Sequence, residues 1–193
     1  MKAVFFVVIA WFSLTGAAFK RVAPVDVAIV TTSGTIVVRL DAAKAPRTAR
    51  NFLRYVASGA YNGSSFYRNV TRANEPQAPF EVIQGGLGAQ SHAAMLAPLA
   101  LEPTTVTGLH NVGGSIAMAR TADPDSATTE FFLDIGDARY LDAGGPLGPG
   151  YAAFGHVVRG MDVVLKIHRA PTQVEQLTPP IRIVRMRRIS ALR

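Results

Sequence analysis

Short runs rich in β-branched and other apolar residues recur along the chain, bounded by turn-forming residues. The first two runs, 25–31 and 35–40, flank a Thr-Ser-Gly turn and predict a hairpin in which Gly34 makes the turn. The remaining runs predict strands at 66–70, 80–84, 113–119, 131–135, 152–158 and 181–189. A long connection rich in Gly, Ala and Pro is expected at 87–110, with a short strand near 99–102.

Two segments have helical spacing instead. Between Pro46 and Gly59, apolar residues recur every three or four positions, a proline suits the first turn, and the glycine follows as a stop. A second, shorter helix is expected at 161–168. Strands and helices do not alternate as a parallel sheet requires, and about eight short strands favour a closed antiparallel barrel, which has no exposed edges.

The chain has 193 residues, of which 49% are hydrophobic, enough for one domain with a sizeable core. Residues 1–18 differ from the rest, because Lys2 precedes an apolar run at 3–14 and then small residues. This layout predicts a cleaved secretory signal peptide, followed by one domain over 19–193. An uncleaved anchor is the alternative, but the run is short beside the about 20 apolar residues that a bilayer requires.

The formal net charge of +7 raises the question of an anionic partner. The basic residues are scattered, and the one cluster, Arg182, Arg185, Arg187 and Arg188, has no interleaved aromatic residues for base stacking. We therefore interpret this cluster as a solvated or adhesive surface and expect no nucleic-acid partner. The absence of cysteine excludes thiol chemistry, and the four histidines lack metal-ligand spacing, so no metal and no cofactor are expected.

The strongest candidate for chemistry is a pair of side chains on two strands. If the strands at 66–70 and 80–84 pair, Arg68 and Gln84 lie beside each other although sixteen positions separate them. A guanidinium is a rigid fork of hydrogen-bond donors, and a glutamine carbonyl can hold it in one orientation. Such a pair can polarise a substrate without a nucleophile.

Five motifs follow one another in a characteristic order: SSFYR, VIQGG, GGSIAMAR, TTEFFLDIG and AAFGHVVRGMDVV. In this order they resemble the cyclophilin-type peptidyl-prolyl cis-trans isomerases, over roughly 25–189 of the chain. The resemblance implies a closed eight-stranded antiparallel β-barrel with two helices covering its open ends. It also implies a monomeric enzyme that isomerises the bond before proline in polypeptides and needs no cofactor.

The resemblance also assigns residues to the site. Arg68 matches the family's catalytic arginine, Gln84 the glutamine that orients it, and Phe132 the aromatic floor of the proline pocket. Phe131 should point to the opposite face, because side chains alternate along a strand. Further positions expected to contact substrate are Val82, Ala119, Arg120, Glu130, Tyr140, Leu141 and Tyr151.

The chain departs from the family pattern in ways that matter for activity. Glu81 stands where the family has a pocket phenylalanine, and Phe80 could replace it only if the insert between the strands introduces a bulge. Glu130 replaces a glutamine and Arg120 an asparagine, while Tyr140 stands for a tryptophan or related aromatic residue and Tyr151 for a histidine. We expect the two carboxylates to compete for Arg68, and so to weaken catalysis or favour basic peptides.

The sequence thus predicts an exported isomerase that assists the folding of other exported proteins, in the periplasm of a double-membraned bacterium. One alternative is a noncatalytic peptide-binding or chaperone module on the same fold. A second is an envelope adhesion or scaffold protein that binds through its basic surface, which would make its binding salt-sensitive.

Overall fold

Nine antiparallel strands form one sheet in the part of the chain that the structure, a computed structural model, describes: residues 23–88 and 95–190. They are β1 (Val25–Thr31), β2 (Gly34–Leu40), β3 (Ser65–Val70), β4 (Glu81–Gly86), β5 (Ser115–Met118), β6 (Phe131–Ile135), β7 (Ala153–Arg159), β8 (Thr172–Gln173) and β9 (Gln176–Ile189). The leader predicted at 1–18 and the domain start at residue 19 lie outside the described residues. Within these ranges no helix is long and apolar enough to cross a membrane.

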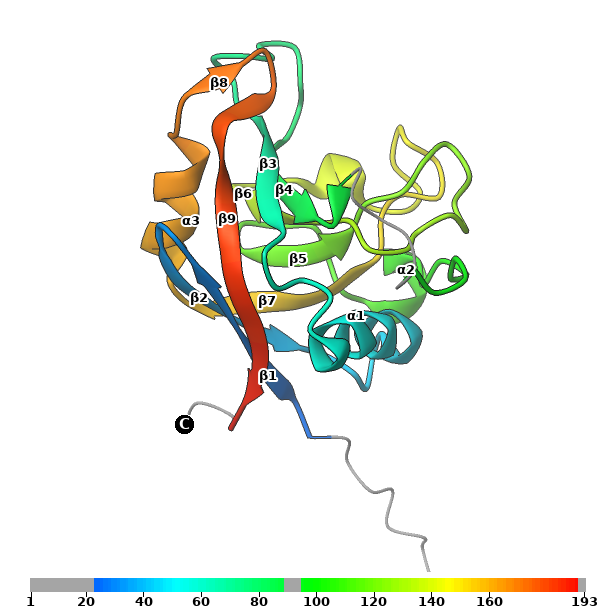
Figure 1. Cartoon of the computed structure of the whole chain (residues 1–193). Helices are drawn as coiled ribbons and strands as arrows, with labels where there is room; N and C mark the ends of the chain where they lie inside the picture. The colour runs from blue at the N-terminus through cyan, green and yellow to red at the C-terminus, as the bar shows by residue number, and fades with distance from the viewer. Residues whose placement is uncertain (1–22, 89–94, 191–193) are drawn as a thin grey trace, which may run out of the picture.

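The sheet closes into a barrel through its first and last long strands. The strand order is β1-β2-β7-β5-β6-β4-β3-β9-β8, and β9 also pairs with β1, from Asp26 opposite Ile189 to Thr31 opposite Ile183. In Figure 1 the red β9 runs beside the blue β1 at one end and beside β3 at the other. Eight strands therefore form the closed barrel, as predicted, and β8 is a short addition beside β9.

The last strand is longer than the sequence pattern predicts. β9 begins at Gln176 and continues through Pro179 and Pro180, whereas the predicted strand begins at residue 181. Proline cannot donate to a ladder, but here the pairing with β3 jumps from Gln176 opposite Arg68 to Ile181 opposite Phe66, so both prolines lie in the interruption. The two-residue β8 was not predicted either, because it is too short to have a pattern.

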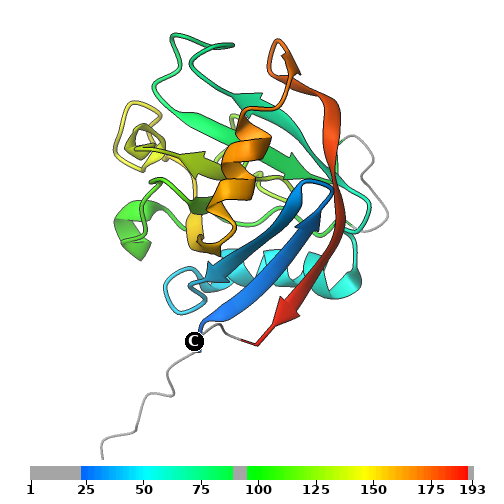
Figure 2. The ribbon, with the colours of Figure 1, turned by 90° about the vertical axis from the view of Figure 1, so that its left-hand side faces the viewer.

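Both predicted helices form, as α1 (Pro46–Ser58) and α3 (Met161–His168). They lie on different sides of the barrel (Figures 1 and 2), and α1 ends at Gly59, whose φ of 73° is in the left-handed region. The structure adds a one-turn helix, α2 (Thr104–Thr107), and a 3₁₀ turn at Arg139–Leu141. The short strand expected at 99–102 is wrong, since only Leu99 forms a bridge there, to Ala127.

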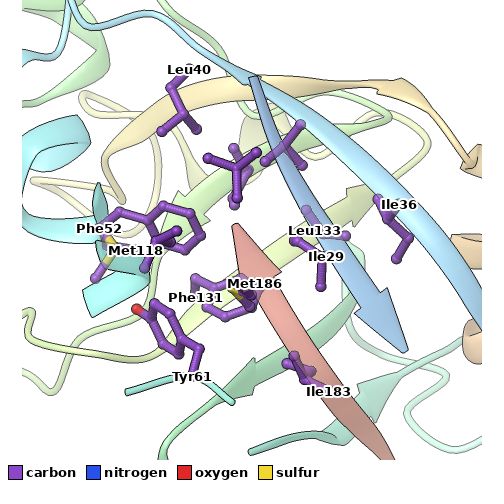
Figure 3. Packing of buried hydrophobic residues seen from close by; sticks show 14 of the residues in the cluster. Ile29, Ile36, Leu40, Phe52, Tyr61, Met118, Phe131, Leu133, Ile183 and Met186 are labelled. Carbon is purple, nitrogen blue, oxygen red and sulfur yellow. The ribbon is translucent and has the colours of Figure 1, made fainter. Parts of the chain in front are cut away.

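The barrel interior is one apolar cluster to which both helices contribute. Ile167 from α3 belongs to this cluster. Figure 3 shows Phe52 from α1 beside inward residues of the strands. Phe131 is at its centre, with its ring centroid 5.5 to 5.7 Å from those of Phe52, Tyr61 and Phe66. These edge-to-face contacts fix the position of β6 within the barrel.

A second apolar cluster lies on the outer wall of the same strands. Along β6, Phe131 and Leu133 belong to the interior cluster, whereas Phe132 belongs to the outer one. In β4, likewise, Ile83 faces inward and Val82 outward. The alternation expected for strand residues therefore builds a barrel core and, on the reverse side of the same strands, the wall of the candidate site.

Asp134, two residues after Phe132 on β6, has a buried carboxyl group. Its Oδ2 atom lies 2.5 Å from Ser115 Oγ. Burial raises the pKa of Asp134 well above its ordinary value, an effect that the hydrogen bond from Ser115 opposes and the nearby Asp142 reinforces. The folded protein thus holds this proton to a higher pH than the unfolded chain does.

This difference predicts that the free energy of unfolding falls as the pH rises. The contribution of neutral Asp134 is fully present below the unfolded pKa, near 3.8, and is lost as the pH rises through the higher folded pKa. Asp134→Asn, which stays neutral, should flatten this slope in denaturation experiments between about pH 4 and pH 8. Asp162→Asn, at an exposed position on α3, is the control, and equal slopes for Asp134→Asn and the wild type would contradict the assignment.

Candidate active site

A register shift in β3 places Arg68 on the outer wall of the barrel. Phe66 pairs with Gly85 and faces the core, and Arg68 pairs with the next residue, Gln84, so Tyr67 is an extra residue between them. One extra residue exchanges the faces of a strand, so Arg68 lies on the same side as Val70 of the outer cluster. The predicted pairing of Arg68 with Gln84 is confirmed. The register shift that turns Arg68 to the outer wall has no signal in the sequence.

Arg68 and Gln84 border a pocket of about 140 Å³ on this outer wall. Nine residues line it: Arg68, Phe80, Val82, Gln84, Ala119, Arg120, Phe132, Leu141 and Tyr151. All of them except Phe80 are among the site residues that the sequence predicts. A cavity of about 150 Å³ can hold a benzene molecule, so this pocket has room for one proline ring.

The rim of the pocket carries a fixed positive charge. The guanidinium carbon of Arg120 lies 4.6 Å from the ring centroid of Tyr151, and Arg120 Nε donates a hydrogen bond of 2.8 Å to the carbonyl oxygen of Gly150. Tyr151 in turn packs edge-on against Phe132, with a centroid distance of 5.5 Å. The stacked arginine and tyrosine therefore form one wall beside the phenyl ring.

Two acceptors hold the guanidinium of Arg68. Its Nη1 donates to Gln84 Oε1 at 2.8 Å, its Nε to Glu175 Oε2 at 2.8 Å, and its Nη2 to Glu175 Oε1 at 3.2 Å. Each terminal nitrogen carries two hydrogens, so one N–H on Nη1 and one on Nη2 have no partner among the described residues. Sequence reasoning missed Glu175, which is 107 positions away from Arg68 and has no motif around it.

A chain of hydrogen bonds fixes the amide of Gln84. Gln84 Nε2 donates to the hydroxyl oxygen of Tyr67 at 2.9 Å, and that hydroxyl donates to Glu130 Oε2. Burial and the contact with Glu130 raise the pKa of Tyr67, which keeps the hydroxyl protonated. Because the amide nitrogen of Gln84 is engaged in this way, its oxygen faces Arg68.

Two of the residues predicted to contact substrate, Glu130 and Tyr140, do not line this pocket, and their contact with substrate stays a prediction. The Glu130 carboxylate accepts hydrogen bonds from Tyr67, from the backbone N–H of Gly88 at 3.0 Å and from the Thr129 hydroxyl at 2.9 Å, so it lies behind Gln84. The ring of Tyr140 stacks on Phe80 with a centroid distance of 6.3 Å and supports the pocket from outside. Which of the matched side chains face the pocket cannot be deduced from motif position.

The expected competition of Glu81 and Glu130 for Arg68 is wrong. Glu81 pairs with Arg72 at 3.3 Å and lies 3.5 Å from His168 Nε2. The carboxylate that does bind Arg68 is Glu175. Phe80 does reach the pocket, but from the residue directly before β4, and the register shift between β3 and β4 falls at Tyr67 instead of near Phe80.

The described residues contain no group of three His, Asp or Glu side chains that could hold a metal ion. The arrangement instead offers donors of a fixed guanidinium beside an apolar pocket. This combination suits binding and polarisation of an amide, without a covalent intermediate.

Comparison with known proteins identifies one family. The family model described as cyclophilin type peptidyl-prolyl cis-trans isomerase/CLD matches residues 26–188. Peptidyl-prolyl cis-trans isomerase A of Dickeya dadantii is 37% identical over 156 residues, covering 81% of this chain and 77% of the relative. A peptidyl-prolyl cis-trans isomerase of Acinetobacter baylyi is 40% identical over 162 residues, covering 80% of each chain.

Solved structures support the fold independently. A cyclophilin type peptidyl-prolyl cis-trans isomerase of Cryptosporidium parvum superposes with a TM-score of 0.72 at 21% identity, covering 88% of this chain and 100% of the other. A second structure of that protein, solved in the presence of the dipeptide Ala-Pro, has a TM-score of 0.70 at 22% identity, covering 86% and 99%.

Proposed function

The chain belongs to the cyclophilin-type peptidyl-prolyl cis-trans isomerases, and we propose that it isomerises X-Pro bonds of polypeptides by hydrogen-bond donation from Arg68. The observation that carries this proposal is the Arg68 guanidinium, held by Gln84 at the edge of a pocket that fits a proline ring. A related fold solved with Ala-Pro also supports a proline-containing ligand.

The reaction needs no bond to be made or broken. Rotation about an X-Pro amide crosses a barrier of about 18–20 kcal/mol because it destroys the conjugation of nitrogen with the carbonyl group. In the twisted state the prolyl nitrogen regains a lone pair, and an N–H donor aimed at it stabilises this state over both planar forms. A millionfold acceleration requires only about 8 kcal/mol of such preferential stabilisation.

Each part of the pocket has a proposed task in this mechanism. Phe132, with Val82 and Leu141, holds the proline ring by apolar contact, so one side of the bond stays fixed. Arg68 supplies the donor to the prolyl nitrogen from an N–H that Gln84 and Glu175 leave free. Ala119, which is small, leaves space for the substrate backbone, which turns on the other side of the bond.

We further propose that the enzyme acts on exported proteins, in the periplasm. The support is the signal-peptide layout of residues 1–18, together with the bacterial origin of several relatives. The natural substrates would then be unfolded or partly folded chains with accessible prolines. Fractionation of cells that express the full chain tests this location, and recovery of the protein with its leader intact in the cytoplasm would contradict it.

Exchange NMR on peptides with acidic, neutral or basic residues before proline tests the activity. We expect the wild-type protein to accelerate cis-trans exchange and to shift resonances of Phe132, Ala119 and Leu141 on peptide titration. Binding at these residues without any acceleration would support the alternative of a noncatalytic peptide-binding module. Salt-sensitive binding of anionic polymers with neither effect would support the adhesion alternative.

A further inference from the structure

We propose that Glu175 is a positioning residue that fixes the orientation of the Arg68 guanidinium for isomerisation. This inference rests on the proposed role of Arg68 and adds a residue from the turn between β8 and β9. Glu175 is not among the residues that line the pocket, so its effect on the substrate passes through Arg68.

The contact between the two side chains has two points. Glu175 Oε2 accepts from Nε and Oε1 from Nη2, at 2.8 and 3.2 Å, so the carboxylate covers one edge of the guanidinium plane. A paired contact of this kind restricts rotation of the guanidinium group in a way that one hydrogen bond cannot. Gln84 holds Nη1, and the two acceptors together define the plane in which the remaining N–H groups lie.

The backbone around Glu175 is also held by hydrogen bonds. The pairs Thr172–Leu177 and Gln173–Gln176 form a hairpin that leaves Val174 and Glu175 as its two turn residues. The carbonyl oxygen of Glu175 accepts a hydrogen bond of 2.8 Å from the N–H of Asn69, the residue after Arg68. The turn is therefore attached to β3 at the residue next to the proposed catalytic arginine.

Val174 has a backbone conformation that is unusual for its type. Its φ is 55°, in the left-handed region that β-branched residues rarely adopt, and the residue is 80% exposed and so gains little from packing. Such a conformation persists only where the surroundings impose it, and it is found preferentially at functional sites. Here it allows the tight turn that presents Glu175 to Arg68.

Orientation, more than charge, is the expected contribution of Glu175. The side chains of Arg68 and Glu175 are 31% and 24% exposed, so solvent screens their attraction. Partial neutralisation of Arg68 would by itself weaken donation to the prolyl nitrogen. A fixed donor direction strengthens it, because the reaction requires alignment with one lone pair. We expect the second effect to prevail.

The test compares Glu175→Gln, which keeps the size of the side chain but offers donors where Arg68 needs acceptors, with Glu175→Ala. Both should lower kcat/KM about 5- to 20-fold, with most of the loss in kcat, because the proline pocket is untouched. The Nε–H resonance of Arg68 should lose its protection from exchange. Glu75→Gln, in the insert between β3 and β4, is the matched control and should leave kcat/KM unchanged.

Glu175→Gln in an Arg68→Lys background distinguishes positioning of the guanidinium from a general effect on stability. An ammonium group has no planar fork to orient, so Glu175→Gln should change kcat/KM less than 2-fold there. An equal loss in both backgrounds, or wild-type kcat with Glu175→Gln, would overturn the inference. If Glu175→Gln is silent while Arg68→Ala is inactive, only this inference fails. If Arg68→Ala is also fully active, the proposed function fails with it.

Discussion

Replacing Arg68 by alanine is expected to lower kcat/KM about 10²- to 10³-fold, as removal of one donor from a preorganised site does elsewhere. The variant loses the N–H groups proposed to reach the prolyl nitrogen but keeps the apolar pocket. The affinity for a proline peptide should therefore change far less than the turnover. Exchange NMR on an Ala-Pro peptide, with a titration for affinity, measures both quantities.

Arg54→Ala is the matched control for this substitution. Arg54 lies on the exposed face of α1, so its removal should leave both turnover and affinity at wild-type values. Arg68→Lys keeps the positive charge without the fork and should recover little of the activity. If Arg68→Ala turned over peptide at the wild-type rate, donation from Arg68 would not be the source of catalysis.

Substitution of the two adjacent phenylalanines should separate stability from activity. Phe131 is fully buried among three aromatic rings, and Phe131→Ala should lower the free energy of unfolding by about 3–5 kcal/mol. Phe132→Ala should cost less stability, because one side of its ring borders the pocket, where there are no partner atoms to lose. Its loss should appear instead in peptide binding and turnover.

Chemical denaturation and the isomerase assay, applied to both variants, check this separation. Phe131→Leu serves as the conservative comparison, since a large apolar side chain at this position should recover part of the stability. Equal destabilisation by Phe131→Ala and Phe132→Ala, or wild-type activity in Phe132→Ala, would contradict the assignment of opposite faces.

Much of the barrel could be predicted because local patterns determine it. The hairpin at Gly34, the helix that ends at Gly59 and the opposite faces of Phe131 and Phe132 all follow from turn chemistry and side-chain periodicity. The closed barrel of eight strands was implied by the order of the motifs. Extension of β9 through Pro179 could not be predicted, since it depends on an interruption in pairing with β3.

Within the site, the position of a side chain could be predicted where strand pairing determines it. The hydrogen-bond partners of the carboxylate groups could not be predicted. The pairing of Arg68 with Gln84 follows from two short strands. The partners of Glu81 and Glu130 do not, because each carboxylate contacts groups that the sequence places far away. Glu175 reaches Arg68 from a two-residue turn, and no local pattern indicates where such a turn lies in three dimensions.

The position of β9 also bears on how the protein is made. This strand joins β1 at one end, and at the other it places Gln176 opposite Arg68 directly after the turn residue Glu175, yet it is the last strand to leave the ribosome. A nascent chain that still lacks it has an open β1 edge and an arginine without its carboxylate. Closure must bring together segments from opposite ends of the chain, which is slow compared with local pairing. We therefore expect isomerase activity to arise only after translation has passed this strand.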